Sequence, residues 1–161
     1  MTSAVEWSAD GRAALATALG ELVMSGSYLE VTAFLVARSV SGVGEPAARA
    51  VFDRSNLEAL LSTIDRLTQV AGKAKGKTHA AALQEWLRAA KKAAATRNQM
   101  VHAMWVGGGE SITGWTSLQR HSARFGEPGW AVEDVRAAVV QIDAAARAAY
   151  ADHVLGPYWS A

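Results

Sequence analysis

A repeat of apolar side chains over residues 15–40 constrains the fold of this chain more than any other feature. Apolar or small residues recur there at alternating spacings of four and three, at Leu15, Leu19, Leu22, Gly26, Leu29, Ala33, Val36 and Val40. Side chains at these spacings line one face of an α-helix. We therefore predict one long helix from about Ala9 to Ser39, with Ser8 as its N-cap and Asp10 in its first turn.

Two steps in this helix carry very small side chains, at Gly20 and at Ser25-Gly26-Ser27. Glycine lowers helix stability and often marks a bend. Small side chains also allow a neighbouring helix to pack at a short distance. We expect the long helix to be weakest at these two steps.

The next segments predict two more helices. Pro46 suits the first position of a short helix that ends near Asp53. The run Ser55-Asn56-Leu57-Glu58 fits a capping box, which would open a second long helix. The side chains of that helix that should face the core are Leu57, Leu60, Leu61, Ile64 and Leu67.

A third long helix is expected to start near Thr78, which can cap it, and to give way before Gly107-Gly108-Gly109. Beyond this glycine run, Ile112, Thr113, Trp115 and Thr116 give the chain strand character. We predict a small β-hairpin that pairs Met104–Val106 with Ile112–Ser117.

The last predicted helix begins at Val132 and ends at Gly156-Pro157, after an irregular stretch over residues 120–130. Its apolar face would hold Val135, Val139, Ile142, Ala146 and either Ala149 or Tyr150. The expected fold class is all-α: a bundle of about four main helices with a small β-hairpin insert between the third and the fourth.

The composition fits one globular domain over residues 1–161. Half of the residues (50%) are hydrophobic and 19% are charged, and the net charge of +1 argues against a uniformly basic nucleic-acid binder. The absence of cysteine excludes disulfides and thiolate chemistry, and it fits a reducing cytoplasm. The N-terminus lacks a signal-peptide pattern, and the most apolar run, Val31 to Ala37, is too short to span a bilayer. We therefore expect a cytoplasmic protein that does not enter a membrane.

The stretch Thr96 to Trp105, at the end of the third long helix, carries the residues with the clearest chemistry. On a helical wheel, Arg97 falls within the apolar sector. Because a guanidinium stays charged, it needs a partner or a polar cleft there. Asn98 and His102 are four residues apart and share one face. Arg97 and His102 thus bracket Asn98 over about 140° of helix surface, and the three are expected to border one groove.

Glu30 lies at the edge of the apolar stripe of the first long helix, and two interpretations stay open for it. It is either an exposed helix charge or a supporting carboxylate that holds Arg97 in the cleft.

Arg97-Asn98 followed by His102 resembles the signature of the HEPN superfamily: an arginine, often followed by Asn, Asp or His, then four to six residues and a histidine. Four residues intervene here. The superfamily is an all-helical bundle with two long helices, and its motif sits near the end of a bundle helix. The hairpin insert is not general to it.

The resemblance implies a ribonuclease that needs neither metal nor cofactor, acting as a toxin, a phage-defence effector or an RNA-processing domain. It implies a homodimer in which two motifs share a cleft, and a toxin would have a cognate antitoxin. Some members of the superfamily have lost catalysis and bind only nucleotides or partner proteins.

The chemistry of the three residues can be judged without the family. Cleavage of RNA by its own 2′-hydroxyl needs a proton acceptor, a proton donor and positive charge on the transition state. An imidazole such as His102 can be base or acid near neutral pH. Arg97 can donate two parallel hydrogen bonds to phosphate oxygens. Asn98 can orient His102 or hold a phosphate.

Two features near this site suggest contacts with RNA. Arg88, Lys91 and Lys92 extend a basic strip that begins in the turn over residues 73–77 and contains one acidic residue, Glu85. Such a strip can attract a phosphate backbone, although a solvated helix face explains it equally well. Core or hairpin packing is expected for most of the tryptophans, but Trp105, which follows His102 by three residues, is the one that we predict to stack on an unpaired base. The other histidines show no spacing typical of a metal site.

Two hypotheses follow from the sequence. The first is a metal-independent RNA endonuclease of the HEPN type. The second is a non-catalytic helical module that binds a partner protein or a nucleotide.

Overall fold

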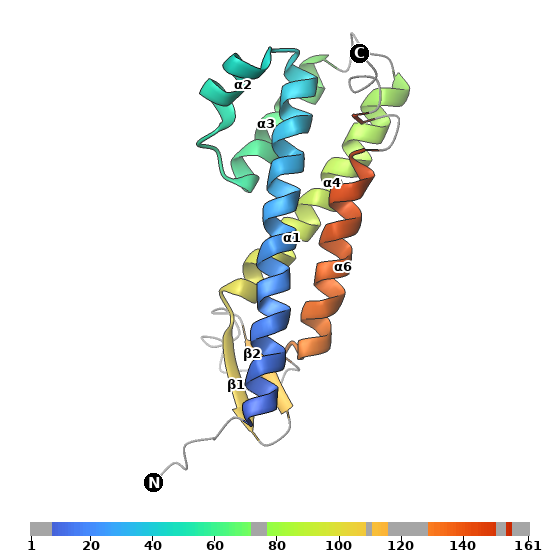
Figure 1. Cartoon of the computed structure of the whole chain (residues 1–161). Helices are drawn as coiled ribbons and strands as arrows, with labels where there is room; N and C mark the ends of the chain where they lie inside the picture. Colours follow the sequence, from blue (N-terminus) through green and yellow to red (C-terminus); the bar gives the residue numbers. More distant parts are fainter. Residues whose placement is uncertain (1–7, 72–76, 109–110, 116–128, 151–153, 156–161) are drawn as a thin grey trace.

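The computed structural model describes residues 8–71, 77–108, 111–115, 129–150 and 154–155. The described chain is predominantly helical, which confirms the predicted all-α class (Figure 1). The elements, in chain order, are α1 (Ala9–Ser41), α2 (Glu45–Phe52), α3 (Leu57–Ala71), α4 (Lys77–Val101), β1 (Met104–Gly108), β2 (Ser111–Trp115) and α6 (Val132–Ala148).

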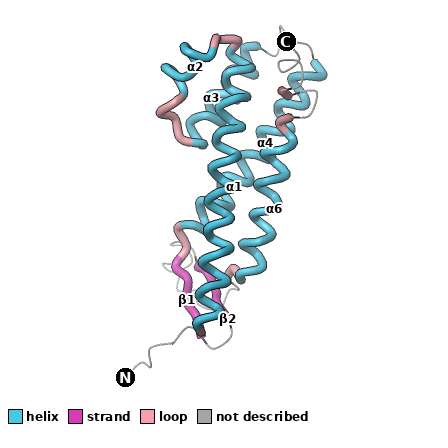
Figure 2. Tube along the Cα trace, viewed as in Figure 1, coloured by secondary structure: helices cyan, strands magenta, loops and turns pink. Residues whose placement is uncertain are grey.

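The helix α1 is the axis of the bundle. It contacts α6, α3 and α4, and Figure 1 shows it running most of the length of the molecule. The hairpin of β1 and β2 lies at one end of the helical body, beside the first turns of α1 (Figure 2). As predicted, this hairpin joins the third and fourth main helices, α4 and α6.

The apolar stripe predicted on α1 forms the centre of the core. Leu22, Leu29, Ala33 and Val36 are fully buried, and Leu19 is half-buried. The predicted N-cap is confirmed, since the Ser8 hydroxyl oxygen accepts a hydrogen bond from the Gly11 N–H at 3.0 Å. The helix ends two residues later than predicted, at Ser41. Gly42 then takes a positive φ of 70°, which favours glycine, and its N–H donates to the Arg38 carbonyl.

The starts of α3 and α4 differ slightly from the prediction. Asn56, and not Ser55, caps α3, because the Asn56 side-chain oxygen accepts a hydrogen bond from the Ala59 N–H at 2.9 Å. The predicted capping box is therefore wrong: the N-cap lies one residue later, and the residue at its N3 position is Ala59, which cannot return a hydrogen bond. Both Ser and Asn are good N-caps. Thr78 lies within α4, which already begins at Lys77. The core-facing side chains predicted on α3 are buried or packed against the core.

The hairpin is antiparallel, with Met104 opposite Trp115 and Val106 opposite Thr113. The first strand extends to Gly108, beyond the predicted Val106, and the described second strand is Ser111–Trp115. Gly114 also exchanges two backbone hydrogen bonds with Trp130, which ties the hairpin to the chain just before α6. Most of the stretch predicted to be irregular lies outside the described residues.

The last helix starts at Val132, as predicted, but it ends at Ala148. The predicted end at Gly156-Pro157 was therefore too late, and those two residues lie outside the described part. Ala149 is buried and Tyr150 is exposed, which places Ala149 on the apolar face. The Tyr150 ring instead stacks on Tyr28 of α1, with ring centroids 6.5 Å apart.

By length and apolar composition alone, α1 could cross a membrane, and 39% of its most apolar window is buried inside the bundle. The sequence-based expectation considered only the run Val31 to Ala37, and it missed the apolar character of the whole helix. The central helix of a soluble bundle has the same composition, because its partners cover one face.

Candidate functional site

Arg97 lies near the C-terminal end of α4, and its side chain packs against α1 at Gly26. A Cβ atom on Gly26 would lie 3.0 Å from Nε of Arg97 and 3.3 Å from its Cγ. Only glycine leaves this space, so the small-residue step at Ser25-Gly26-Ser27 admits an arginine side chain. The structure thus explains how a charged residue fits into the apolar sector of α4: its stem packs on bare backbone.

The guanidinium of Arg97 is held from its own helix. Its Nη1 donates a hydrogen bond of 3.0 Å to the side-chain oxygen of Asn98. Its Nε is buried and has no hydrogen-bond partner among the described residues. The adjacent pair of the motif is therefore one unit, in which Asn98 fixes one end of the Arg97 guanidinium.

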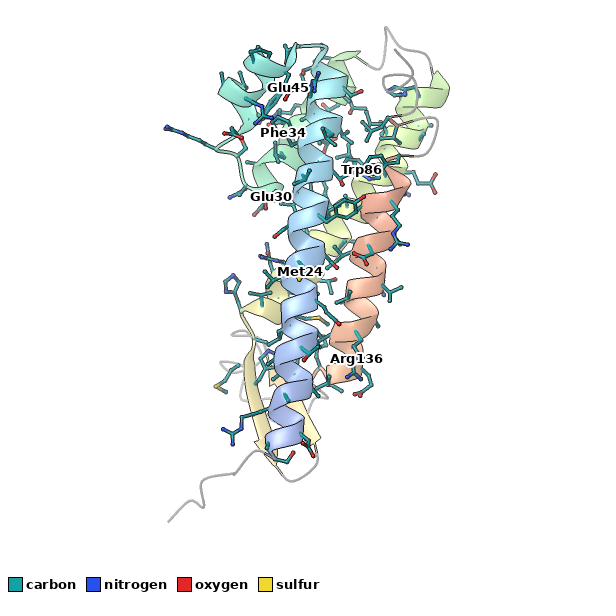
Figure 3. All side chains as sticks on the ribbon, viewed as in Figure 1. Met24, Glu30, Phe34, Glu45, Trp86 and Arg136 are labelled. Atoms are coloured by element: carbon teal, nitrogen blue, oxygen red, sulfur yellow. The ribbon has the colours of Figure 1, made fainter. Side chains whose placement is uncertain are left out.

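The idea that Glu30 holds Arg97 is wrong for the described structure. Both residues are described, and no ion pair or hydrogen bond joins them. Glu30 is half-buried and lines a different cavity, of about 580 Å³, formed by α1, α2 and the start of α3 (Figure 3 shows Glu30 on α1). Glu30 lies one helical turn after Gly26, and Gly26 is the residue of α1 on which Arg97 packs.

His102 is the first residue beyond α4, and its side chain is exposed. Its backbone N–H donates to the Asn98 carbonyl at 3.2 Å, so the helical path continues to His102. The imidazole is therefore attached to a fixed backbone position, one turn after Asn98, and is open to a ligand.

Asn98 also lines a groove of about 560 Å³ between two bundle helices. We call it the α3–α4 groove, and its described lining is Glu58, Leu61 and Ser62 from α3 and Lys91, Ala94, Ala95, Asn98 and Gln99 from α4. Neither Arg97 nor His102 lines it. The expectation that all three motif residues border one groove is therefore wrong for this groove: Arg97 turns toward α1, and His102 lies past the helix end.

The basic strip on α4 is weaker than the sequence indicated. Arg88, Lys91 and Lys92 are exposed, but Lys91 forms an ion pair with Asp65 of α3. The hydrogen bond from Lys91, helped by its charge, lowers the pKa of the Asp65 carboxyl, while desolvation opposes the shift. A carboxylate from another helix thus neutralises one of the predicted RNA-binding residues. Arg88 and Lys92 remain candidates for phosphate contacts.

Trp105 is a residue of β1, and its half-buried side chain packs within the hairpin. Its indole N–H donates to the Met100 carbonyl at 3.2 Å, and its ring lies on Gly114, where a Cβ would meet Cη2 at 2.8 Å. This favours the packing interpretation over base stacking. Trp86 is also a core residue, because it is buried and its indole N–H donates to the Ala145 carbonyl at 2.9 Å (Figure 3).

Comparison of the chain with protein-family models, with curated proteins and with solved structures finds no match.

Two features of the site region were absent from the sequence-based reasoning. Met24, Tyr28 and Val31 form an exposed apolar stripe along α1, and Met24, which Figure 3 labels, is exposed by 74%. Their spacing of four and three could have revealed it, since it repeats the pattern of the buried stripe. No sequence pattern indicates the ion pair between Asp65 and Lys91, because it depends on how α3 and α4 pack.

Proposed function

We propose that this protein is a metal-independent RNA endonuclease of the HEPN type that cleaves through attack of the 2′-hydroxyl. The observation that carries the proposal is the arrangement around Asn98. Its side chain fixes the Arg97 guanidinium, and its carbonyl accepts from the backbone of His102. A permanent cation and an exposed imidazole thus both neighbour Asn98 at the end of α4.

In the proposed reaction, one imidazole accepts the proton of the ribose 2′-hydroxyl as that oxygen attacks the neighbouring phosphorus. The bond from phosphorus to the 5′-oxygen breaks, and the departing oxygen receives a proton from a second donor. The products are a 2′,3′-cyclic phosphate and a free 5′-hydroxyl. His102 is suited to the proton transfers. The Nη N–H groups of Arg97 that Asn98 does not use would donate to the phosphate oxygens as negative charge develops.

We propose a homodimer as the active form, because the reaction needs both an acid and a base. The motif supplies one imidazole per chain, and the His102 of a second copy would supply the other. The exposed apolar stripe of Met24, Tyr28 and Val31 on α1 offers a surface for such a contact, because exposed apolar patches often mark interfaces.

The biological setting follows from the motif resemblance. We propose a cytoplasmic toxin or defence effector that acts on cellular or phage RNA. A cognate antitoxin would then cover the exposed His102 or the α1 stripe.

The test measures cleavage of a labelled single-stranded RNA by purified protein in EDTA. His102→Ala should lower the rate by about 10² to 10⁴-fold, the usual contribution of general acid–base catalysis. Arg97→Ala should lower it by about 10² to 10³-fold, as for other transition-state donors. The matched control is Arg136→Ala on α6, whose side chain is exposed and pairs with Glu133 at 3.7 Å. Full activity in His102→Ala protein would refute the assigned role.

A second candidate function is a non-catalytic module that binds a partner. The cavity between α1, α2 and α3 favours it, because Phe34 and Phe52 line an apolar wall there. At its rim, Glu45 bridges Arg38 and Arg49. RNA that stays intact, together with a partner whose binding is lost in Phe52→Ser protein, would support this function instead.

A further inference from the structure

The α3–α4 groove has the size and the floor of a site for a flat ring. Its volume of about 560 Å³ falls within the range of small-molecule sites, about 300–1,000 Å³. Ala94 and Ala95 of α4 face Leu61 of α3 across it. Because these side chains are short or buried, they form an apolar surface on which a planar ring can lie.

The polar groups of the groove match the edge of a nucleobase. The side-chain amides of Asn98 and Gln99 each offer N–H donors and a carbonyl acceptor, and Ser62 offers a hydroxyl. Glu58, in the first turn of α3, contributes a carboxylate that only accepts hydrogen bonds when it is ionised. Amide and carboxylate side chains are the groups that proteins use to read bases with amino groups.

The charges in the groove favour a base over a phosphate. Lys91 lines the groove, but Asp65 neutralises it. Among the described residues, Glu58 makes no ion pair, so its charge is uncompensated. A phosphate would meet net repulsion there, whereas an N–H edge would be attracted.

Asn98 connects this groove to the proposed catalytic residues. It lines the groove, and its side-chain oxygen holds Arg97. A base in the groove would therefore lie one side chain away from the guanidinium that contacts the cleaved phosphate.

We propose that the α3–α4 groove binds a base of the RNA substrate and selects bases that carry an exocyclic amino group, with Glu58 as the specificity-determining residue. This inference rests on the proposed function. Uracil presents a carbonyl where cytosine presents an amino group, so Glu58 would attract cytosine and repel uracil.

The experiment measures binding of labelled oligocytidine and oligouridine of equal length by fluorescence anisotropy. The protein carries His102→Ala, which prevents cleavage during the measurement. We expect binding of the cytosine oligomer to be about tenfold tighter, as expected for one well-placed base contact. In the Glu58→Gln variant the preference for the cytosine oligomer should fall from tenfold to less than about twofold, because the amide of glutamine can also donate to uracil.

The matched control is Glu85→Gln, which removes the same charge from an exposed position of α4 outside the groove. It should keep the tenfold ratio, and circular dichroism checks that both variants fold. Equal binding of the two oligomers, or a ratio that Glu58→Gln leaves unchanged, would overturn the inference alone. Loss of all RNA binding and cleavage in every form of the protein would overturn the proposed function as well.

Discussion

The contact between Gly26 and Arg97 makes a quantitative prediction, because α1 contains a second glycine as a matched control. Replacing glycine by alanine within a helix stabilises it by about 0.5–1 kcal/mol. At Gly20, an added Cβ meets nothing within 4 Å. Gly20→Ala should therefore raise the free energy of unfolding by about 0.5–1 kcal/mol.

At Gly26, the same methyl group would meet three atoms of Arg97: Nε at 3.0 Å, Cγ at 3.3 Å and Cδ at 3.5 Å. These atoms belong to the middle of the side chain, so Arg97 has to shift by a few tenths of an ångström. Overpacking of this kind costs about 1–3 kcal/mol. With the helix gain included, Gly26→Ala should change the free energy of unfolding by between about 0 and −2.5 kcal/mol.

Urea denaturation of the two variants, each with Arg97 and with Arg97→Ala, measures this coupling. With Arg97 shortened to alanine, the three atoms nearest to the new methyl group are gone, and Gly26→Ala should stabilise the protein as Gly20→Ala does. The coupling should be about 1–3 kcal/mol at Gly26 and near zero at Gly20. Equal stabilisation by both glycine substitutions in the presence of Arg97 would refute the packing described for this site.

The same pair of variants tests the link to activity. A misplacement of about 1 Å in a positioning side chain can lower a rate by about 10²-fold. The shift forced on Arg97 is a few tenths of an ångström, so we expect Gly26→Ala to cleave RNA several-fold more slowly than the wild-type protein, and Gly20→Ala to cleave at the wild-type rate. Normal activity in a destabilised Gly26→Ala protein would show that Arg97 need not lie at this position.

Two further predictions concern stability. Gly114→Ala should destabilise the protein by about 1–3 kcal/mol, because its Cβ would lie 2.8 Å from the rigid ring of Trp105; an unchanged urea midpoint would refute this. The pKa of Asp65 is lowered by Lys91, so their pair stabilises the fold above the unfolded pKa of about 3.9, and this contribution is lost as the pH falls through the lower folded value. Both side chains are partly exposed, so the contribution should stay below about 1 kcal/mol, and Asp65→Asn protein should lose less stability on acidification than the wild type.

Local periodicity was sufficient to predict the helices. The buried stripe from Leu15 to Val40 shows directly in the sequence because each side chain repeats a helical spacing. The ends of elements were less well predicted, since Ser55 and Asn56 are both good caps and only the folded chain decides between them. The end of α6 at Ala148 was missed for a similar reason, because no glycine or proline marks it.

At the site, the predicted and the observed partners of side chains differ where a contact joins two helices. The place of Arg97 depends on Gly26, which belongs to another helix, and the sequence offered Glu30 as an equally near partner. From the sequence, Lys91 was predicted to contact RNA as a free cation, because its ion-pair partner Asp65 is distant along the chain. The motif itself could be found in the sequence, since Arg97, Asn98 and His102 belong to one continuous helix end.

The most direct test of the proposed nuclease is the chemical nature of the RNA ends that it produces. Purified wild-type protein, incubated with single-stranded RNA in EDTA, should yield fragments that end in 2′,3′-cyclic phosphates and begin with 5′-hydroxyls. The His102→Ala protein, purified in the same way, should yield almost none. Intact RNA in both reactions, or the same fragments from both proteins, would contradict the account.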